Sequence, residues 1–150
     1  LLDLFAGSGA VGLEALSRGA KKAIFVDNDP RCAAVIGENI GILSIGKDAA
    51  GVHPYEIFQT DAFAAIKVFA RQGKKFDVVF IDPPYSRELE KKALKTLEAY
   101  DILQPNCTIV IQHDKKEILP EQQGRFLLFR QKKYGSTIFS IYKSDLGNTG

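Results

Sequence analysis

A tetrapeptide in the middle of the chain, Asp82-Pro83-Pro84-Tyr85, combines an acid, two prolines and an aromatic ring. Consecutive prolines make a stiff loop, which suits catalysis that works by positioning. The exocyclic amine of a nucleobase is a poor nucleophile, because its lone pair is delocalised into the ring. Hydrogen bonds from this amine to the Asp82 carboxylate and the Pro83 carbonyl would let the nitrogen pyramidalise and attack a methyl group, with Tyr85 stacked on the base. The alternative is a proline-rigidified turn that caps the next helix.

A glycine-rich segment near the start of the chain, from Gly7 to Gly12, matches the pattern G-x-G-x-x-G. It follows a predicted strand and precedes a predicted helix, where such glycines permit a tight turn and the close approach of a ligand. Asp27 comes twenty positions after Gly7, at the end of the second predicted strand. Its carboxylate can accept hydrogen bonds from both hydroxyl groups of a ribose there. The alternative is that the glycines only form a turn and that Asp27 is a helix N-cap.

Two further acids end predicted strands and indicate which nucleotide binds. Asp3 lies just before the glycines, where it would suit a ligand's ammonium group and sit badly beside a pyrophosphate. Asp61 follows the third predicted strand and can accept from an adenine amine, cap the helix Ala62–Arg71, or do both. S-adenosylmethionine carries an ammonium group and no phosphate. Three acids at three successive strand ends therefore favour this methyl donor over a nicotinamide cofactor.

Short β-branched or aromatic runs alternate with helical patterns, which predicts βαβ units around a parallel sheet. The expected strands are Leu1–Phe5, Ala23–Asp27, Tyr55–Gln59, Phe76–Ile81 and Thr108–Gln112, and the expected helices start after Gly9 and at Pro30 and span Ala62–Arg71 and Arg87–Tyr100. The run Phe76–Ile81 is the most apolar, so we expect it to be central and buried on both faces. Two later runs, Arg125–Arg130 and Thr137–Tyr142, predict an antiparallel hairpin around Tyr134-Gly135.

The predicted fold class is α/β, a Rossmann-like, doubly wound, mostly parallel sheet with a C-terminal antiparallel hairpin. One domain is expected over residues 1–143, followed by a frayed tail over 144–150. Apolar residues at helical spacing indicate the helix faces that turn toward the sheet. These are Val11, Ala15 and Leu16 in the first helix, Cys32, Val35, Ile36, Ile40 and Leu43 in the second, and Leu89, Ala93, Leu94 and Leu97 in the helix after the tetrapeptide.

The composition is that of an ordinary globular domain, with 150 residues, 45% of them hydrophobic and 25% charged. A net charge of +2 permits a polyanionic partner without requiring one. Apolar runs are far too short to span a bilayer and no leader is visible, so we expect a cytoplasmic protein with no membrane contact. No Cys, His and carboxylate cluster has metal-ligand spacing, so no metal is expected. Cys32 and Cys107 are interpreted as buried thiols, and His53 and His113 as loop residues without a special role.

The tetrapeptide resembles that of the amine-directed class of S-adenosylmethionine-dependent methyltransferases, in which Asn or Asp precedes Pro-Pro and an aromatic residue. The segment from Leu2 to Ala20 is similar, more narrowly, to the RsmD-type family. This likeness covers nearly the whole chain, from Leu1 to about Tyr142. It implies methyl transfer to the exocyclic amine N2 of guanine in 16S ribosomal RNA, with naked RNA or a small-subunit particle as the partner and a monomeric enzyme.

The resemblance also implies roles for individual residues. The methionine part of the cofactor would be lined by Asp3, Phe5, Ala6, Gly7 and Gly9. Asp27 would hold the ribose, Asn28 would flank the adenine, and Asp61 with Ala62 would contact the adenine edge. The tetrapeptide would receive the target base. The chain opens inside a predicted strand and without Met, so we expect that an N-terminal segment, which in this family helps to grip cofactor and RNA, has been left out.

Three other functions remain open at this point. An amine methyltransferase acting on DNA or on another RNA would have the same fold and tetrapeptide. A nicotinamide-dependent oxidoreductase would use the glycine loop but has no use for the acid-Pro-Pro sequence. A non-catalytic RNA-binding module would be signalled by an altered tetrapeptide, and here the tetrapeptide is intact.

Overall fold

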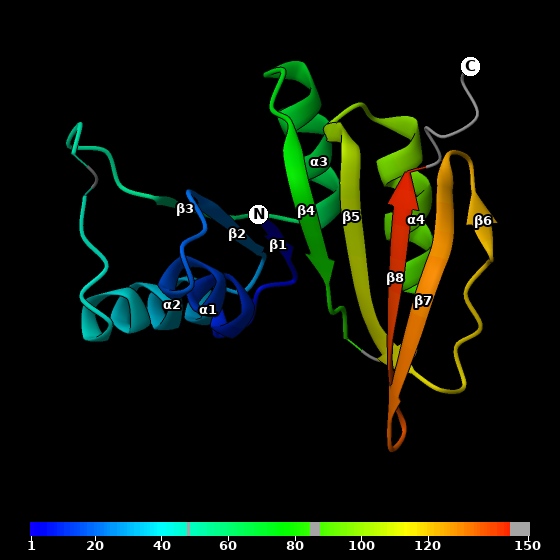
Figure 1. Ribbon diagram of the computed structural model, residues 1–150. Helices are drawn as coiled ribbons and strands as arrows, with labels where there is room; N and C mark the ends of the chain where they lie inside the picture. The colour runs from blue at the N-terminus through cyan, green and yellow to red at the C-terminus, as the bar shows by residue number, and fades with distance from the viewer. Residues whose placement is uncertain (48, 85–87, 145–150) are drawn as a thin grey trace. The chain divides into compact units, whose positions relative to one another are not determined.

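The computed structural model describes residues 1–47, 49–84 and 88–144. The chain forms two compact units, Leu1–Ala65 and Ile66–Gly150, and each is described by itself. Figure 1 shows the helices and strands of both units. Among the residues that the structure describes, no helix combines the length and apolar character needed to cross a bilayer.

The first unit is a three-stranded parallel sheet with its helices. Its elements are β1 (Leu2–Leu4), α1 (Ala10–Ser17), β2 (Ala23–Asp27), α2 (Pro30–Ile42), β3 (Tyr55–Gln59) and the start of α3 (Ala62–Arg71). The strand order is β3-β2-β1. In the register, Leu4 lies beside Val26, and Asp27 lies beside Gln59. The carboxyl ends of all three strands therefore meet at one edge of this sheet.

Two helices of this unit begin at side-chain caps. The carboxylate of Asp29 accepts a hydrogen bond of 2.9 Å from the backbone N–H of Arg31, and Pro30 occupies the first turn, where its missing N–H is harmless. The carboxylate of Asp61 accepts a hydrogen bond of 2.9 Å from the N–H of Ala64. The cap of α2 is therefore Asp29 and not Asp27, whereas Asp61 does cap α3.

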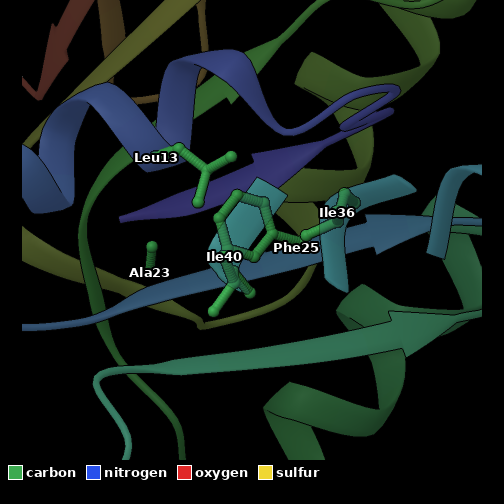
Figure 2. Packing of buried hydrophobic residues seen from close by; sticks show 5 residues of the cluster. All are labelled: Leu13, Ala23, Phe25, Ile36 and Ile40. Carbon is green, nitrogen blue, oxygen red and sulfur yellow. The ribbon is translucent and has the colours of Figure 1, made fainter. Parts of the chain in front are cut away.

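The core of the first unit lies between the helices and β2, where Leu13, Ala23, Phe25, Ile36 and Ile40 pack together (Figure 2). The expected inward face of α1 is wrong at Val11, which is 37% exposed. Gly12 and Leu13 are the buried residues instead. In α2, Ile36 and Ile40 are buried as predicted, but Val35 and Leu43 are exposed. The buried stripe of α2 is thus narrower than predicted. Only Ile36 and Ile40, one helical turn apart, belong to the buried cluster around Phe25.

Gly12 is expected to tolerate no side chain, because a Cβ atom there would lie 2.4 Å from Cε1 of Phe25, inside the core. Substitution Gly12→Ala should lower the free energy of unfolding by about 1–3 kcal/mol through overpacking. The matched control is Gly37→Ala in α2, where a Cβ meets nothing within 4 Å. Because alanine has a higher helix propensity than glycine, Gly37→Ala should raise the free energy of unfolding by roughly 0.5–1 kcal/mol. Urea unfolding monitored by circular dichroism measures both. Equal stabilities for the two variants would contradict the packing argument.

The second unit contains the end of α3 and the elements β4 (Phe76–Ile81), α4 (Leu89–Ala99), β5 (Leu103–Asp114), β6 (Gln122–Gln123), β7 (Phe126–Tyr134) and β8 (Thr137–Ser144). Its strand order is β4-β5-β8-β7-β6. The pair β4–β5 is parallel, and the pairs β5–β8, β8–β7 and β7–β6 are antiparallel. α4 packs against β5 and β6, with Ala93, Leu94 and Leu97 buried as predicted.

Several sequence predictions for this unit need correction. β5 is twelve residues long, because β4 pairs with it from Leu103 and β8 pairs with it as far as Asp114. In β4 only Val79–Ile81 are fully buried after Phe76, whereas Asp77 is exposed and Val78 is half-buried. The short strand β6 was not predicted, and α4 begins at Leu89. Arg87 and the tail beyond Ser144 lie outside the described residues. The hairpin around Tyr134-Gly135 is confirmed and is longer than expected.

Candidate functional site

The glycine loop leaves β1 in a backbone conformation that turns sharply into α1. Gly7 has φ 59°, which glycine adopts without strain. Within the part of the chain that the structure describes, a Cβ atom on Gly7 would meet nothing within 4 Å, which leaves room for a ligand beside its backbone. The N–H of Ala6 donates to the carbonyl of Val26 at 2.9 Å, and the N–H of Gly9 donates to the carbonyl of Ala6 at 2.8 Å. These bonds hold the loop against the carboxyl end of β2.

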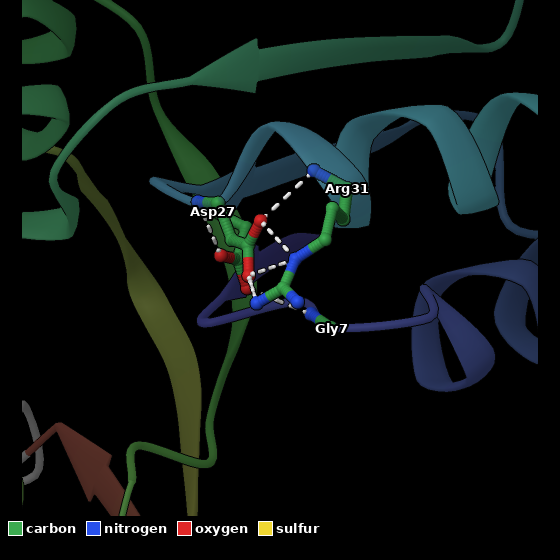
Figure 3. Close-up of polar contacts among 4 residues, drawn as sticks. Gly7, Asp27 and Arg31 are labelled. Atoms are coloured by element: carbon green, nitrogen blue, oxygen red, sulfur yellow. Dashed lines mark hydrogen bonds and ion pairs between the residues drawn. The ribbon is translucent and has the colours of Figure 1, made fainter.

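Asp27 organises the same loop through its side chain (Figure 3). One carboxylate oxygen accepts a hydrogen bond of 2.9 Å from the N–H of Gly7, and the other accepts one of 3.0 Å from the N–H of Asp29. An ionised carboxylate has about four acceptor positions. Two remain available after the backbone bonds, and two is the number that the hydroxyls of one ribose require. The side chain of Asp29, by contrast, is bound to Arg31 in an ion pair of 2.8 Å.

The backbone of Phe5 adopts a strained conformation, which the sequence analysis did not predict. Its φ is 59°, a left-handed conformation that a bulky residue adopts only at a cost of order 1–3 kcal/mol. Its ring contacts that of Phe63 edge to face, with 6.1 Å between the centroids. Such strain persists where the surrounding structure imposes it, and it is concentrated at ligand sites. The loop that resembles a cofactor cradle is therefore also a strained part of the backbone.

Asp3 lies deeper than the cofactor prediction assumed, since the residue is only 2% exposed. A carboxylate oxygen of Asp3 accepts a hydrogen bond of 3.4 Å from the N–H of Gly12, in the first turn of α1. This bond ties β1 to the helix that follows the glycines. Contact between Asp3 and an ammonium group stays a prediction.

The remaining predicted cofactor residues lie at the ends of β2 and β3. Asn28 is exposed, and Asp61 is exposed while it caps α3. Ala62 is buried, so only its backbone could contact an adenine. The N–H of Thr60 donates to the carbonyl of Asp27 at 3.0 Å, which joins these two strand ends. The first unit thus gathers every predicted cofactor residue at one edge of its sheet.

The tetrapeptide begins where β4 ends, in the second unit. Pro83 is buried and Pro84 is exposed. The residue Asp82 has substantial exposed surface, yet the protein around its carboxyl group desolvates it enough to raise its pKa above the ordinary value. A carboxylate in such surroundings accepts hydrogen bonds more strongly than one in bulk water. Tyr85 lies outside the described residues, so its stacking role stays a prediction.

A buried acid beside the tetrapeptide was missed by the sequence analysis. Glu90, in the first turn of α4, is 3% exposed, and among the described residues its Oε2 atom has no hydrogen-bond partner. Burial raises the pKa of Glu90, and the carboxyl groups of Glu117 and Asp82 raise it further. The helical spacing offered a signal, because Glu90 lies three, four and seven positions before Ala93, Leu94 and Leu97 and so falls on the same buried face. Its proximity to Asp82 could be found only from the structure.

His113 also differs from its predicted role. It is buried in β5, where one ring nitrogen lies 2.7 Å from the hydroxyl of Ser140 and the other lies 3.0 Å from the carbonyl of Asp114. The side-chain amide of Gln131 donates to the same hydroxyl at 2.9 Å. This network is a satisfied polar part of the sheet. Over residues 1–47, 49–84 and 88–144, no three Cys, His, Asp or Glu side chains are grouped so as to hold a metal ion.

The strand–glycine loop–helix unit with its carboxylate, together with the acid-Pro-Pro loop after β4, defines an enzyme of the Rossmann-like methyltransferase class. The chain belongs to the family described as Conserved hypothetical protein 95, whose model matches residues 1–143. It is 34% identical to Ribosomal RNA small subunit methyltransferase D of Haemophilus influenzae over 145 residues, which cover 95% of this chain and 70% of the relative.

Solved structures agree with this assignment at the level of the fold. A conserved hypothetical protein of Streptococcus pyogenes matches 96% of this chain and 84% of its own, with a TM-score of 0.83 and 30% identity. An S-adenosylmethionine-dependent methyltransferase of Agrobacterium tumefaciens matches 95% of this chain and 55% of its own, with a TM-score of 0.71 and 18% identity. The predicted α/β fold class and the RsmD-type resemblance are thereby confirmed.

Proposed function

We propose that this protein transfers a methyl group from S-adenosylmethionine to the exocyclic amine N2 of a guanine in 16S ribosomal RNA. The observation that carries the proposal is the acid-Pro-Pro loop at the carboxyl end of β4, with the partly desolvated carboxyl group of Asp82. The name of the Haemophilus influenzae relative supports ribosomal RNA as the acceptor. We propose that the enzyme meets such an acceptor in the cytoplasm and acts as a monomer.

The residues of the first unit fit S-adenosylmethionine. The open space beside Gly7 leaves room for the methionine part, and Asp27 retains acceptor positions for both ribose hydroxyls. Asn28 and the backbone of Ala62 would contact the adenine, and Asp61 would accept from its amine. When bound, this cofactor supplies an electrophilic methyl group on a positively charged sulfur.

Asp82 and Pro83 would prepare the acceptor nitrogen. One amine N–H donates to the Asp82 carboxylate and the other donates to the Pro83 carbonyl, so the nitrogen becomes pyramidal and its lone pair turns out of the base plane. A new N–C bond forms as the S–C bond breaks, and the sulfur keeps the electron pair. The methylated amine is then acidic and releases one proton to Asp82 or to water. Because no strong base is required, orientation supplies most of the acceleration, up to about 7–11 kcal/mol in favourable cases.

The test is a methyl-transfer assay in which the full-length protein meets three acceptors: naked 16S ribosomal RNA, assembled small subunits and DNA. Radioactive methyl groups are expected in ribosomal RNA, and nucleoside analysis of the product should show N2-methylguanosine. Labelled DNA would favour the alternative of a DNA amine methyltransferase. Labelled adenosine or cytidine in the RNA would overturn the guanine assignment but preserve the reaction type. The ratio of naked RNA to particle shows which form of the substrate is used.

A further inference from the structure

We propose that the β7–β8 hairpin is an RNA-binding surface, on which single-stranded RNA next to the acceptor nucleotide stacks and forms phosphate contacts. This inference rests on the function proposed above and adds the part of the chain that holds the substrate. It is carried by the charge of the hairpin, by the aromatic side chains on one of its faces, and by the position of its tip relative to Asp82.

The hairpin is strongly basic, although the chain as a whole is nearly neutral. The hairpin, residues 126–144, includes no Asp or Glu and four cationic residues, which are Arg130, Lys132, Lys133 and Lys143. The whole chain has a net charge of +2, so the remaining residues sum to −2. Within the described part of the chain, Arg130, Lys132 and Lys133 form no ion pair with a carboxylate. These charges are therefore available to phosphate groups.

One face of the hairpin combines Arg130, Lys132 and Lys143 with aromatic rings, whereas Lys133 is paired with Ile138 and lies on the other face. Cross-strand pairs share a face, and Lys132 is paired with Phe139 and Tyr134 with Thr137. The rings of Tyr134 and Phe139 lie edge to face with centroids 5.8 Å apart. Beside the bulge in β7, the Nζ atom of Lys143 lies 5.2 Å from the centre of the Phe129 ring. All these side chains lie on the face opposite buried Ser140 and Tyr142.

This face is open to solvent. Phe129 is 64% exposed and Tyr134 is 61% exposed. Large aromatic side chains at such exposure are an unfavourable surface unless they have a partner. Exposed rings interleaved with lysines and an arginine fit single-stranded nucleic acid, because bases stack on the rings while the cations follow the phosphates. A protein partner would be expected to prefer an apolar patch with fewer like charges at its centre.

The register places the hairpin tip at the catalytic end of the second unit. Ile81, the last residue of β4, lies beside Ile111 of β5, and Ile111 pairs with Ser140 of β8. Beyond this level β5 continues to Asp114, which pairs with Thr137 at the tip. Three more residues extend a strand by roughly 10 Å. The tip therefore extends beyond the level of Asp82, the residue that follows Ile81. In Figure 1 the lower ends of β7 and β8 likewise extend beyond the lower end of β4. RNA on the hairpin would lead toward the acceptor loop.

The experiment measures binding of a fluorescent single-stranded RNA oligonucleotide to full-length protein over a range of salt concentrations. The double variant Arg130→Gln/Lys132→Gln, which removes two charges from the aromatic face, should bind more weakly. Its salt slope should be lower by about 0.7 for each phosphate that is no longer neutralised, or roughly 1.4 for two. Tyr134→Ala should lose roughly 5- to 150-fold in affinity, the range for one stacked base, whereas Tyr134→Phe keeps the ring and should bind normally. Matching thermal unfolding curves would show that the variants fold.

The matched control is Lys21→Gln/Lys22→Gln, which removes the same charge from exposed residues at the amino end of β2. It should retain the wild-type salt slope. If the hairpin variant binds RNA as this control does, the hairpin is not the RNA surface, even when methyl transfer to ribosomal RNA persists. If RNA binding depends on the hairpin but no methyl is transferred, the proposed function fails and the surface stands. A wild-type protein that binds no RNA overturns the inference.

Discussion

Replacing Asp82 with alanine is expected to reduce the single-turnover rate of methyl transfer by about 10²-fold or more, a typical contribution of one group that acts in the transition state. Affinity for S-adenosylmethionine should stay nearly unchanged. The hydrogen bond from the acceptor amine strengthens only as the nitrogen becomes pyramidal, and such interactions affect turnover more than binding. Rapid-quench kinetics with bound cofactor and calorimetry measure the two quantities. A near-normal rate in this variant would show that Asp82 has a structural role and does not act in methyl transfer.

Asp82→Asn separates hydrogen bonding from charge. Its amide oxygen can still accept from the amine, so this variant should retain more activity than Asp82→Ala. The pH profile adds a second readout. Burial raises the pKa of Asp82, so the carboxylate becomes protonated at a higher pH than an ordinary Asp, whose pKa is about 3.9. Activity should therefore fall as pH drops through that raised pKa. The loss of activity at low pH that results from protonation of Asp82 should be absent from the pH profile of the asparagine variant.

Replacing Asp27 with alanine should weaken S-adenosylmethionine binding by about 10- to 100-fold, the loss expected for one hydrogen bond to a charged group. The variant loses the acceptor for the ribose and also the bonds from Gly7 and Asp29 that fix the loop. Calorimetric titration with the cofactor or its demethylated product gives the dissociation constant. A tighter interaction with NAD than with the methyl donor would overturn the assignment of the cofactor.

Asp29→Ala is the control for this experiment, because it removes a neighbouring carboxylate that is bound to Arg31 instead of the loop. Loss of this helix cap should lower the midpoint of urea unfolding. Cofactor affinity should change little. Equal losses of affinity in both variants would mean that the effect comes from the helix start and not from the ribose acceptor.

The cofactor edge of the first unit could be predicted because its signals are local. The glycine spacing and the acids at strand ends follow the alternation of strands and helices, and the structure brings Asp27 and Asp61 to the same edge of the sheet. The inward face of α1 could not be predicted in the same way. Hydrophobicity favoured Val11, but close helix–strand packing selects Gly12, which lets the Phe25 ring approach. A prediction based on apolar side chains does not identify a glycine as a buried position.

The second unit shows what depends on contacts distant in sequence. The extra length of β7 and of the carboxyl end of β5 consists largely of polar residues such as Asp114, Lys132 and Lys133, which have no strong strand preference by themselves. Antiparallel pairing with β8 supplies their backbone hydrogen bonds. Helical spacing alone puts Glu90 on the buried face of α4, but its carboxyl neighbours Asp82 and Glu117 come from other segments of the chain. The sequence alone does not show that these residues are neighbours in the folded protein.

The two backbone bonds of Asp27 have a consequence for how tightly a small ligand can bind. The protein itself makes these bonds, so folding preorganises the glycine loop, and the entropy of ordering it is lost during folding and not during association. A nucleoside that enters such a loop needs no induced fit there, and its association rate should be limited by diffusion and desolvation. Free and bound proteins should therefore exchange their amide hydrogens from Ala6 to Gly9 at similar rates.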